Sequence, residues 1–318
     1  MPIPRFTDIL RAQQIIARYL PRPPLHHYPA LDQLLDARVH IKHENHQPVG
    51  AFKVRGGINL LAQMSDAERA RGVIAASTGN HGQSVAYAAR EFGVRATIVA
   101  PERANPLKVA AMQNLGATVL FFGADFDAAR EECESLARER GLRYIHSGDE
   151  PHLIAGVATI ALEIIQDAPD IDIIITPVGG GSGAAGACLA AKTINPRIQV
   201  IGVQSERAPA AYKSWRARAL LADQTETFAE GLATRTAFAL PQKILWDMLD
   251  DFILVRDDEI RRAIVLLLEK AHTLAEGAGA APLAGALKIA ERLRGKKIAL
   301  VCSGGNITTA QLRECLAL

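Results

Sequence analysis

Short apolar segments alternate with helical segments along almost the whole chain. The apolar segments, each of which we interpret as a strand, lie near Val39, Val73, Ala96, Val119, Tyr144, Ile173, Val200, Ile253 and Ile298. Helical segments such as residues 106–115 and 125–140 separate them, and Thr7 is expected to cap a first helix that ends at Pro21. Continuous apolar strands that alternate with helices are typical of parallel sheets covered on both faces. The sequence therefore predicts an α/β fold.

Composition limits the classes of protein that fit this pattern. The 318 residues are 49% hydrophobic, so the chain can bury a large core and is expected to split into two lobes. The 36 Lys and Arg nearly balance the 34 Asp and Glu, and no basic stripe carries interleaved aromatic residues. No apolar run approaches the roughly 18 residues of a membrane span. We therefore expect neither a nucleic-acid partner nor a membrane partner.

The cysteines and histidines suggest a compartment and argue against a metal site. The spacing of the four cysteines shows no pairing, which indicates free thiols in a reducing, cytoplasmic compartment: Cys133, Cys188, Cys302 and Cys315. The first 20 residues carry charges throughout and lack the apolar centre of a signal peptide. Strand alternation places His40 and His43 on opposite faces, so we expect no metal site where His40, His43 and His46 cluster.

A lysine surrounded by small and aromatic residues is a candidate covalent catalyst. Lys53 lies in the run Gly-Ala-Phe-Lys-Val-Arg-Gly-Gly that begins at Gly50. Small neighbours allow a planar ring to approach the backbone, and the ring of Phe52 lowers the local dielectric, which favours the neutral, nucleophilic amine. Such a lysine forms Schiff bases with carbonyl compounds. A solvated surface lysine is the ordinary alternative, and the accompanying loops decide against it.

Three loops, each placed between an apolar strand and a helix, accompany this lysine. The glycine-rich loop of residues 178–183 offers free N–H groups at the start of a helix, an arrangement that suits a phosphate dianion. Residues 77–82, Ser-Thr-Gly-Asn-His-Gly, offer N–H groups to a carboxylate and an Asn amide to a ring oxygen. Residues 302–306, Cys-Ser-Gly-Gly-Asn, form the third loop. Each alone is an ordinary turn sequence.

Taken together, the four segments resemble the serine/threonine dehydratase family of pyridoxal-phosphate enzymes, which has the tryptophan-synthase-β-like fold and includes serine racemase among its relatives. The resemblance extends from about Thr7 to the C-terminus. It implies that Lys53 holds pyridoxal 5'-phosphate as a Schiff base and that Lys53 is the catalytic residue. The substrate carboxylate is implied to bind Ser77, Thr78, Gly79, Asn80 and His81. The cofactor is implied to contact Phe52, Lys53, Asn80, Gly179, Gly180, Gly181, Ser182, Gly183 and Ser303, with Ser182 replacing a glycine of the commonest pattern.

The resemblance also implies an architecture and an activity. A small lobe of residues 52–146 is expected to be inserted in a large lobe of residues 1–51 and 147–318. Each lobe is expected to have an open, mostly parallel sheet flanked by helices. The cofactor is expected to lie in the cleft between the lobes. The implied reaction is deamination, by β-elimination, of a small β-hydroxy amino acid, L-threonine or L-serine, in a homodimer or homotetramer. Val54 follows the lysine where threonine and cysteine synthases tend to have Asp, which favours a dehydratase.

Three alternatives remain open from the sequence. An amino-acid racemase of the same family would use a hydroxyl at Thr78, and a 3-hydroxyaspartate dehydratase could pair Arg235 with a second carboxylate. Residues 181–186 also fit the GxGxxG pattern of a nicotinamide oxidoreductase, with Glu206 at a suitable distance. That pattern leaves Lys53 without a role. The divalent-metal ligands of serine racemases would fall on Gln204, Ala208 and Ala210, so no metal is expected.

Overall fold

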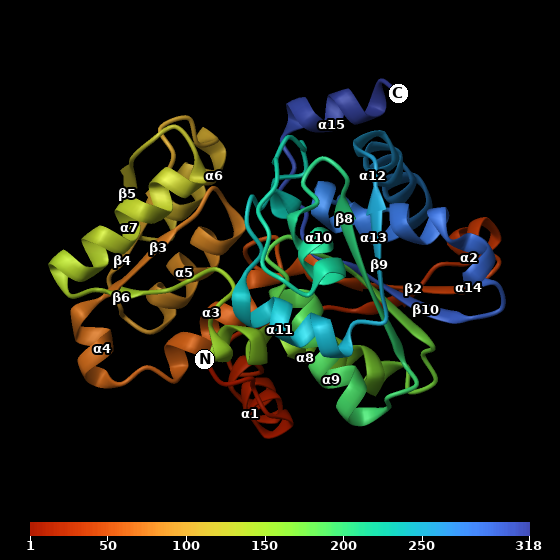
Figure 1. The fold of residues 1–318 in the computed structure, drawn as a ribbon, viewed down its shortest axis with the longest axis horizontal. Helices are drawn as coiled ribbons and strands as arrows, with labels where there is room; N and C mark the ends of the chain where they lie inside the picture. Colours follow the sequence, from red (N-terminus) through yellow and green to blue (C-terminus); the bar gives the residue numbers. More distant parts are fainter.

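The structure is a computed structural model that describes residues 1–318, and it contains two sheets in two lobes (Figure 1). The six-stranded sheet has the order β1 (Leu25–His27), β2 (Arg38–His43), β10 (Lys297–Cys302), β7 (Ile173–Pro177), β8 (Gln199–Ser205), β9 (Asp251–Val255). The four-stranded sheet has the order β5 (Thr118–Phe121), β4 (Ala96–Ala100), β3 (Val73–Ala76), β6 (Arg143–Tyr144). Every strand pair is parallel except β1 with β2. The predicted α/β class with two mostly parallel sheets is confirmed.

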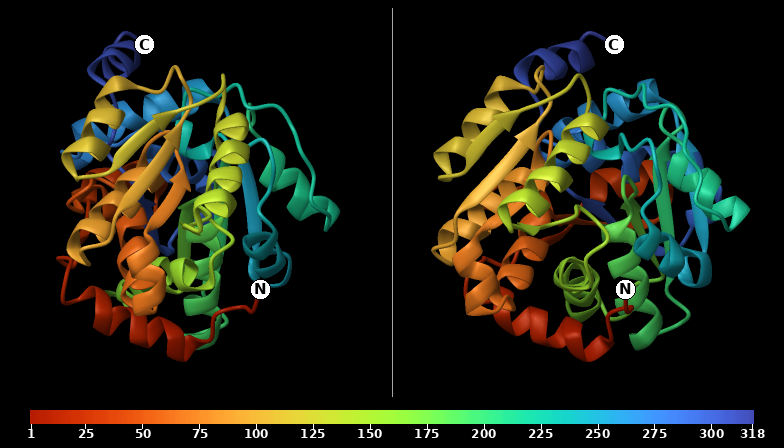
Figure 2. Two further views of the ribbon diagram at one scale, coloured as in Figure 1. Left: turned by 90° about the vertical axis from the view of Figure 1, so that its left-hand side faces the viewer. Right: turned by 60° about the vertical axis from the view of Figure 1, so that its left-hand side comes forward.

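Helices cover both sheets. Those around the four-stranded sheet are α4 (Asp66–Arg71), α5 (Asn80–Glu91), α6 (Pro106–Asn114) and α7 (Phe126–Arg140), and α3 (Lys53–Ala62) lies between the lobes. The large lobe contains α1 (Phe6–Ile16), α2 (Pro29–Leu35), α8 (Pro151–Asp167), α9 (Ser182–Ile194), α10 (Ala210–Ala217), α11 (Ala239–Met248), α12 (Asp257–Ala271), α13 (Gly277–Lys288), α14 (Ala290–Leu293), α15 (Thr309–Leu316) and the 3-10 turns η1 (Glu44–His46) and η2 (Glu230–Leu232). In both views of Figure 2, α15 lies at one end of the molecule and α1 at the other.

Strand alternation explains why the central strands are apolar without interruption. Ile173 and Ile175 of β7 face the cluster of buried residues that includes α12 and α13. Ile174 points to the opposite face, where α8 and α9 pack. Because both faces are buried, neither set of positions can be polar. This is the physical basis of the sequence pattern from which the fold was predicted.

Some local predictions need correction. Thr7 is not the cap of α1, because the helix begins at Phe6 and the N–H of Arg5 donates to the carboxylate of Asp8 at 2.8 Å. The helix ends at Ile16, well before Pro21. Strand β1 was not predicted, since its sequence Leu-His-His lacks an apolar alternation and it is exposed at the sheet edge. The lobe boundaries at residues 51/52 and 146/147 stay a prediction, because α3 packs against helices of both lobes.

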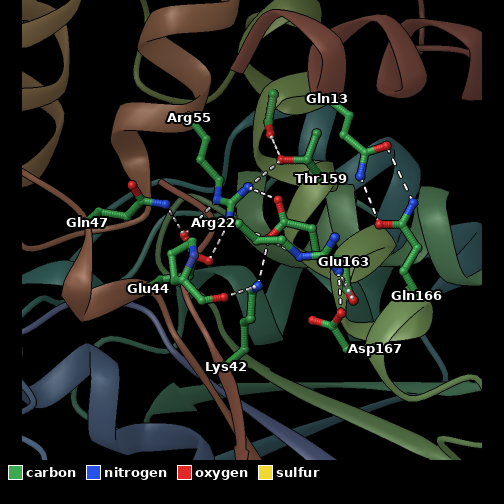
Figure 3. Close-up of polar contacts among 12 residues, drawn as sticks. Gln13, Arg22, Lys42, Glu44, Gln47, Arg55, Thr159, Glu163, Gln166 and Asp167 are labelled. Atoms are coloured by element: carbon green, nitrogen blue, oxygen red, sulfur yellow. Dashed lines mark hydrogen bonds and ion pairs between the residues drawn. The ribbon is translucent and has the colours of Figure 1, made fainter. Parts of the chain in front are cut away.

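A buried cluster of charges fixes α3 between the lobes (Figure 3). The guanidinium of Arg55 donates to both carboxylate oxygens of Glu44 at 2.7 and 2.8 Å and to both of Glu163 at 2.7 and 2.8 Å. Lys42 donates to Glu163 at 2.6 Å. These four side chains are almost completely buried. Burial alone would raise the pKa of Glu163, but the hydrogen bonds and charges of Arg55 and Lys42 lower it overall.

We expect Arg55→Ala to reduce the free energy of unfolding by about 3–5 kcal/mol, because it leaves two buried carboxylates without their shared partner. The control is Asp247→Asn, which breaks the exposed pair with Arg218 and should change stability by less than about 1 kcal/mol. Urea unfolding of both variants measures the difference. Equal losses for the two variants would show that the buried cluster does not anchor α3.

Candidate active site

A cavity of about 750 Å³ opens between the lobes. Its walls come from the ends of β3, β7 and β10, the start of α3 and the segments that precede α6 and α11. All the residues that the family resemblance implied for cofactor and substrate binding line this one cavity: Phe52, Lys53, Ser77, Thr78, Gly79, Asn80, His81, Gly179, Gly180, Gly181, Ser182, Gly183 and Ser303. Segments distant in sequence therefore meet at the carboxyl ends of strands from both sheets, where α/β proteins bind ligands.

Lys53 is the first residue of α3, and its amine faces the cavity without a counter-ion. The Nζ donates to the carbonyl oxygen of Ser147 at 2.8 Å and to Oγ of Ser182 at 3.1 Å. It lies 5.4 Å from the centre of the Phe52 ring. Burial lowers the pKa of Lys53 to about 8. A desolvated amine surrounded by neutral groups is nucleophilic near neutral pH, as carbonyl chemistry requires.

The glycine-rich loop of residues 179–183 joins β7 to α9 and carries unpaired N–H groups. None of its five backbone N–H groups donates a hydrogen bond within the chain. Side chains are sterically excluded here, since a Cβ on Gly179 would lie 2.2 Å from the carbonyl oxygen of Gly231, and one on Gly180 would lie 2.0 Å from the ring of Phe238. Gly181 has a φ of +89°, which only glycine adopts readily. This row of N–H groups at a helix start fits a phosphate group.

The loop of residues 77–81 presents a second set of free N–H groups. Oγ of Ser77 accepts from the N–H groups of Gly79 and Gly82 at 3.0 and 2.8 Å, which folds the loop over its own side chain. The N–H groups of Thr78, Asn80 and His81 have no partner within the chain. They lie at the start of α5, where a carboxylate is favoured. The Ser77 side chain therefore shapes the loop, and its hydroxyl hydrogen stays available as a donor.

The ring of His81 is engaged with the protein. Its Nε2 lies 3.2 Å from the carbonyl oxygen of Ile145, and its Nδ1 has no hydrogen-bond partner. Burial, aided by the charge of Lys53, lowers the pKa of His81 to about 3. The imidazole is neutral at physiological pH, so the main-chain N–H of His81, and not its ring, is available to an anion.

Two residues that sequence reasoning missed hold the amide of Asn80. Nδ2 of Asn80 donates to Oε1 of Glu276 at 2.7 Å, and Oδ1 of Asn80 accepts from Nδ2 of Asn306 at 2.8 Å. The amide orientation is therefore fixed from both ends. Glu276 is buried, and burial raises the pKa of its carboxyl despite the nearby Lys108 and the hydrogen bond from Asn80. One feature of the sequence could have pointed to Glu276, because no other Asp, Glu, Lys or Arg lies between Lys270 and Lys288.

The remaining candidate residues divide between the cavity and the surface. Ser303 is buried at the end of β10, where its carbonyl oxygen accepts from the N–H of Phe52 at 2.9 Å. Arg235 is half exposed and pairs with Asp127 at 3.1 Å, outside the cavity. This position does not support Arg235 as the partner of a second substrate carboxylate.

The alternative of a nicotinamide oxidoreductase depends on the three glycines of the GxGxxG pattern in residues 181–186. The third of them, Gly186, is needed for helix packing. Gly186 lies inside α9, where a Cβ would approach the backbone N of Ala158 in α8 to 2.8 Å. The first two belong to the loop that shares its cavity with Lys53, Asn80 and Ser303. The pattern therefore reflects close helix packing next to a phosphate-type loop.

The structure shows neither a cluster of metal ligands nor a helix that could span a membrane. No group of three or more His, Cys, Asp or Glu side chains is arranged to hold a metal ion. Gln204, at the position of a predicted missing metal ligand, is buried and accepts from the N–H of Tyr212 at 3.0 Å. None of the helices combines the length and the apolar character needed to cross a membrane.

Comparisons with known proteins agree with this site. The family model of pyridoxal-phosphate dependent enzymes matches residues 16–304. An L-threonine ammonia-lyase of Thermotoga maritima is 41% identical over 301 residues, which cover 94% of this chain and 75% of that protein. The processed threonine deaminase isoform 2 of Solanum lycopersicum superimposes with a TM-score of 0.93 at 31% identity, covering 98% of this chain and 91% of that one. Maize serine racemase gives 0.94 at 30% identity, with 99% and 98% covered.

We expect the amine of Lys53 to become reactive as the pH rises through about 8, because the lowered pKa makes it neutral there, whereas an ordinary lysine titrates near pH 10.4. The protein, freed of any cofactor, is treated briefly with trinitrobenzenesulfonate at several pH values. Peptide mapping then gives the rate of modification at position 53. A midpoint near pH 10 would contradict the desolvated, unpaired state of this amine.

Proposed function

This chain belongs to the pyridoxal-phosphate-dependent enzyme family, and we propose that it deaminates L-threonine or L-serine to 2-oxobutyrate or pyruvate and ammonia. The observation that carries this proposal is the position of Lys53. Its amine has no counter-ion and lies in one cavity with two separate sets of unpaired N–H groups. One set suits a phosphate dianion and the other suits an amino-acid carboxylate.

The donor set of the cavity fits pyridoxal phosphate. When bound, this cofactor supplies an aldehyde that condenses with amines and a ring that withdraws electrons from the substrate Cα. The N–H groups of residues 179–183 would hold its phosphate, and Lys53 would hold it covalently. Asn80 would face the ring oxygen and Ser303 the ring nitrogen. A serine hydroxyl carries no negative charge, so Ser303 does not enforce protonation of that nitrogen, and elimination tolerates this better than transamination.

The protein groups divide the work on the substrate. The N–H groups of Thr78, Asn80 and His81 bind the carboxylate and fix the orientation of the Cα–H bond. Nζ of Lys53, with its pKa lowered to about 8, is then the base that removes the Cα proton. Glu276 and Asn306 hold the Asn80 amide in a single orientation.

Two similar proteins and the residue Val54 support a β-hydroxy amino acid as the substrate. An L-threonine ammonia-lyase and a catabolic L-threonine dehydratase of Staphylococcus aureus are similar over 94% of this chain. Val54, directly after the lysine, is completely buried, so an Asp at this position would need a partner in the core. We propose threonine as the first substrate to be tested.

Racemisation is a second candidate because a hydroxyl is present at position 78. Thr78 lines the same cavity as Lys53, and the structural neighbours include serine racemases of maize and Dictyostelium discoideum. A racemase needs an acid-base group on the face of the substrate opposite Lys53. The γ-methyl of threonine restricts χ1 relative to serine, which limits how well the Thr78 oxygen serves this purpose.

Lys53→Ala is expected to abolish release of keto acid from L-threonine and L-serine, because it removes both the covalent attachment and the base. It should also remove the cofactor that borohydride fixes to the wild-type protein. The matched control is Lys270→Ala, a change at an exposed lysine of α12, which should leave keto-acid release unchanged. Undiminished keto-acid release by Lys53→Ala would reject the proposed function.

Wild-type protein incubated with L-serine in deuterium oxide is expected to release pyruvate faster than it accumulates D-serine. The Thr78→Ser variant should shift this ratio towards D-serine, since the smaller side chain frees the hydroxyl to rotate. Chiral chromatography of the remaining serine and a keto-acid assay measure both rates. If D-serine accumulates faster than pyruvate in the wild-type protein, racemase is the better description.

A further inference from the structure

One segment of the large lobe borders the opening of the cavity. Residues 225–238, here called the strap, form the second part of the connection from α10 to α11 and run along the edge of the large lobe that faces the small lobe (Figure 1). Thr225, Glu230, Gly231, Ala233, Thr234 and Phe238 of the strap line the cavity. The strap is fastened to its own lobe at one end, where Oγ1 of Thr227 and the N–H of Phe228 donate to the carboxylate of Asp257 at 2.7 and 3.2 Å.

Two strap residues, Glu230 and Arg235, form ion pairs with the small lobe. Nζ of Lys108, on α6, lies 2.5 Å from Oε2 of Glu230. Arg235 pairs with Asp127, on α7, at 3.1 Å. The side chains of Lys108 and Glu230 are 10% and 38% exposed, and those of Arg235 and Asp127 are 51% and 14% exposed. Both pairs are therefore partly screened by solvent, and the first one borders the cavity itself.

The Lys108–Glu230 pair also connects the two candidate binding loops. Next to Glu230, the carbonyl oxygen of Gly231 packs so closely on Gly179 that a Cβ on Gly179 would lie 2.2 Å from it. The aliphatic part of Lys108 packs on Gly79, where a Cβ would lie 3.0 Å from Cδ of the lysine. A continuous row of contacts thus leads from the phosphate-type loop of one lobe to the carboxylate-type loop of the other.

We infer that the Lys108–Glu230 ion pair is a clasp that holds the small lobe in the position competent for substrate binding. The inference rests on the proposed function for its substrate, but the clasp itself is defined by contacts within the chain. Both residues act through the loops that they hold, so they are positioning residues. Their salt bridge adds to binding only by raising the fraction of molecules in which the two loops face each other at the required distance.

The test compares Glu230→Gln, Lys108→Met and the double variant, with Glu226→Gln as control. Glu226 also belongs to the strap, but its partner Arg207 lies in the same lobe and both side chains are exposed. We expect each single variant to raise the KM for L-threonine about fivefold to tenfold with kcat changed less than about twofold, since the open state lowers apparent affinity without altering the bound site. The double variant should be no worse than either single one, and the control should match the wild type.

A second measurement does not depend on any substrate. Amide hydrogen exchange of residues 77–81 and 225–238, followed by mass spectrometry in the absence of amino acid, should be faster in both clasp variants and unchanged in Glu226→Gln. Unchanged exchange in the clasp variants would overturn the inference. So would additive effects in the double variant, or a fall in kcat at constant KM. If no amino acid is turned over at all, the proposed function fails, while the exchange data still decide the clasp.

Discussion

The position of Lys53 depends on the arginine two residues after it. Arg55 makes four charge-assisted hydrogen bonds, two to Glu44 and two to Glu163, so the first turn of α3 is joined to the end of β2 and to α8. Glycines complete this anchorage, since a Cβ on Gly156 would lie 2.6 Å from the carbonyl oxygen of Arg55. A lysine side chain has many rotamers, and its amine reaches a defined point only if its backbone is fixed. The buried charges serve that purpose, although burying them brings little net stability.

The absence of a carboxylate partner for the Lys53 amine determines the electrostatics of the cavity. No carboxylate pairs with Lys53, so burial is free to lower its pKa to about 8. The buried carboxylate on the cavity wall, Glu276, accepts from Asn80 instead, and its own pKa is raised. A lysine with a lowered pKa and two rows of N–H donors thus share one cavity, where main-chain dipoles attract anions. Under the proposed function, such a site would bind dianionic and carboxylate groups without pairing its amine with a fixed carboxylate.

Strands and loops that are defined by neighbouring residues could be predicted from the sequence, whereas contacts between residues far apart in the chain could not. Apolar strands and glycine loops carry their signal within about ten residues, so each strand–loop–helix unit could be predicted from its own sequence. The family resemblance then implied that these loops surround Lys53, and residues 77–81, 179–183 and Ser303 do line one cavity with it. Asn80 was predicted to face a cofactor, but its partner Glu276 is 196 residues away and is held there by the fold. The short edge strand β1 also escaped prediction, because its polar sequence gains its structure from pairing with β2. Partners that meet only through tertiary structure leave no periodic trace.

The two kinds of contact between the lobes indicate where they can move. At the base, α3 packs against α8 so closely that a Cβ on Gly56 would lie 2.7 Å from the side chain of Leu153, and close-packed surfaces of this kind do not separate without opening a void. At the cavity, the lobes meet through polar contacts, which are the Lys108–Glu230 and Arg235–Asp127 pairs and the hydrogen bonds of Asn80 with Glu276 and Asn306. The partners in these contacts regain hydration when they part. Separation therefore costs least at the strap and most at α3. A hinge at the base and a polar closure at the opening would let substrate enter while the backbone that carries Lys53 stays in place.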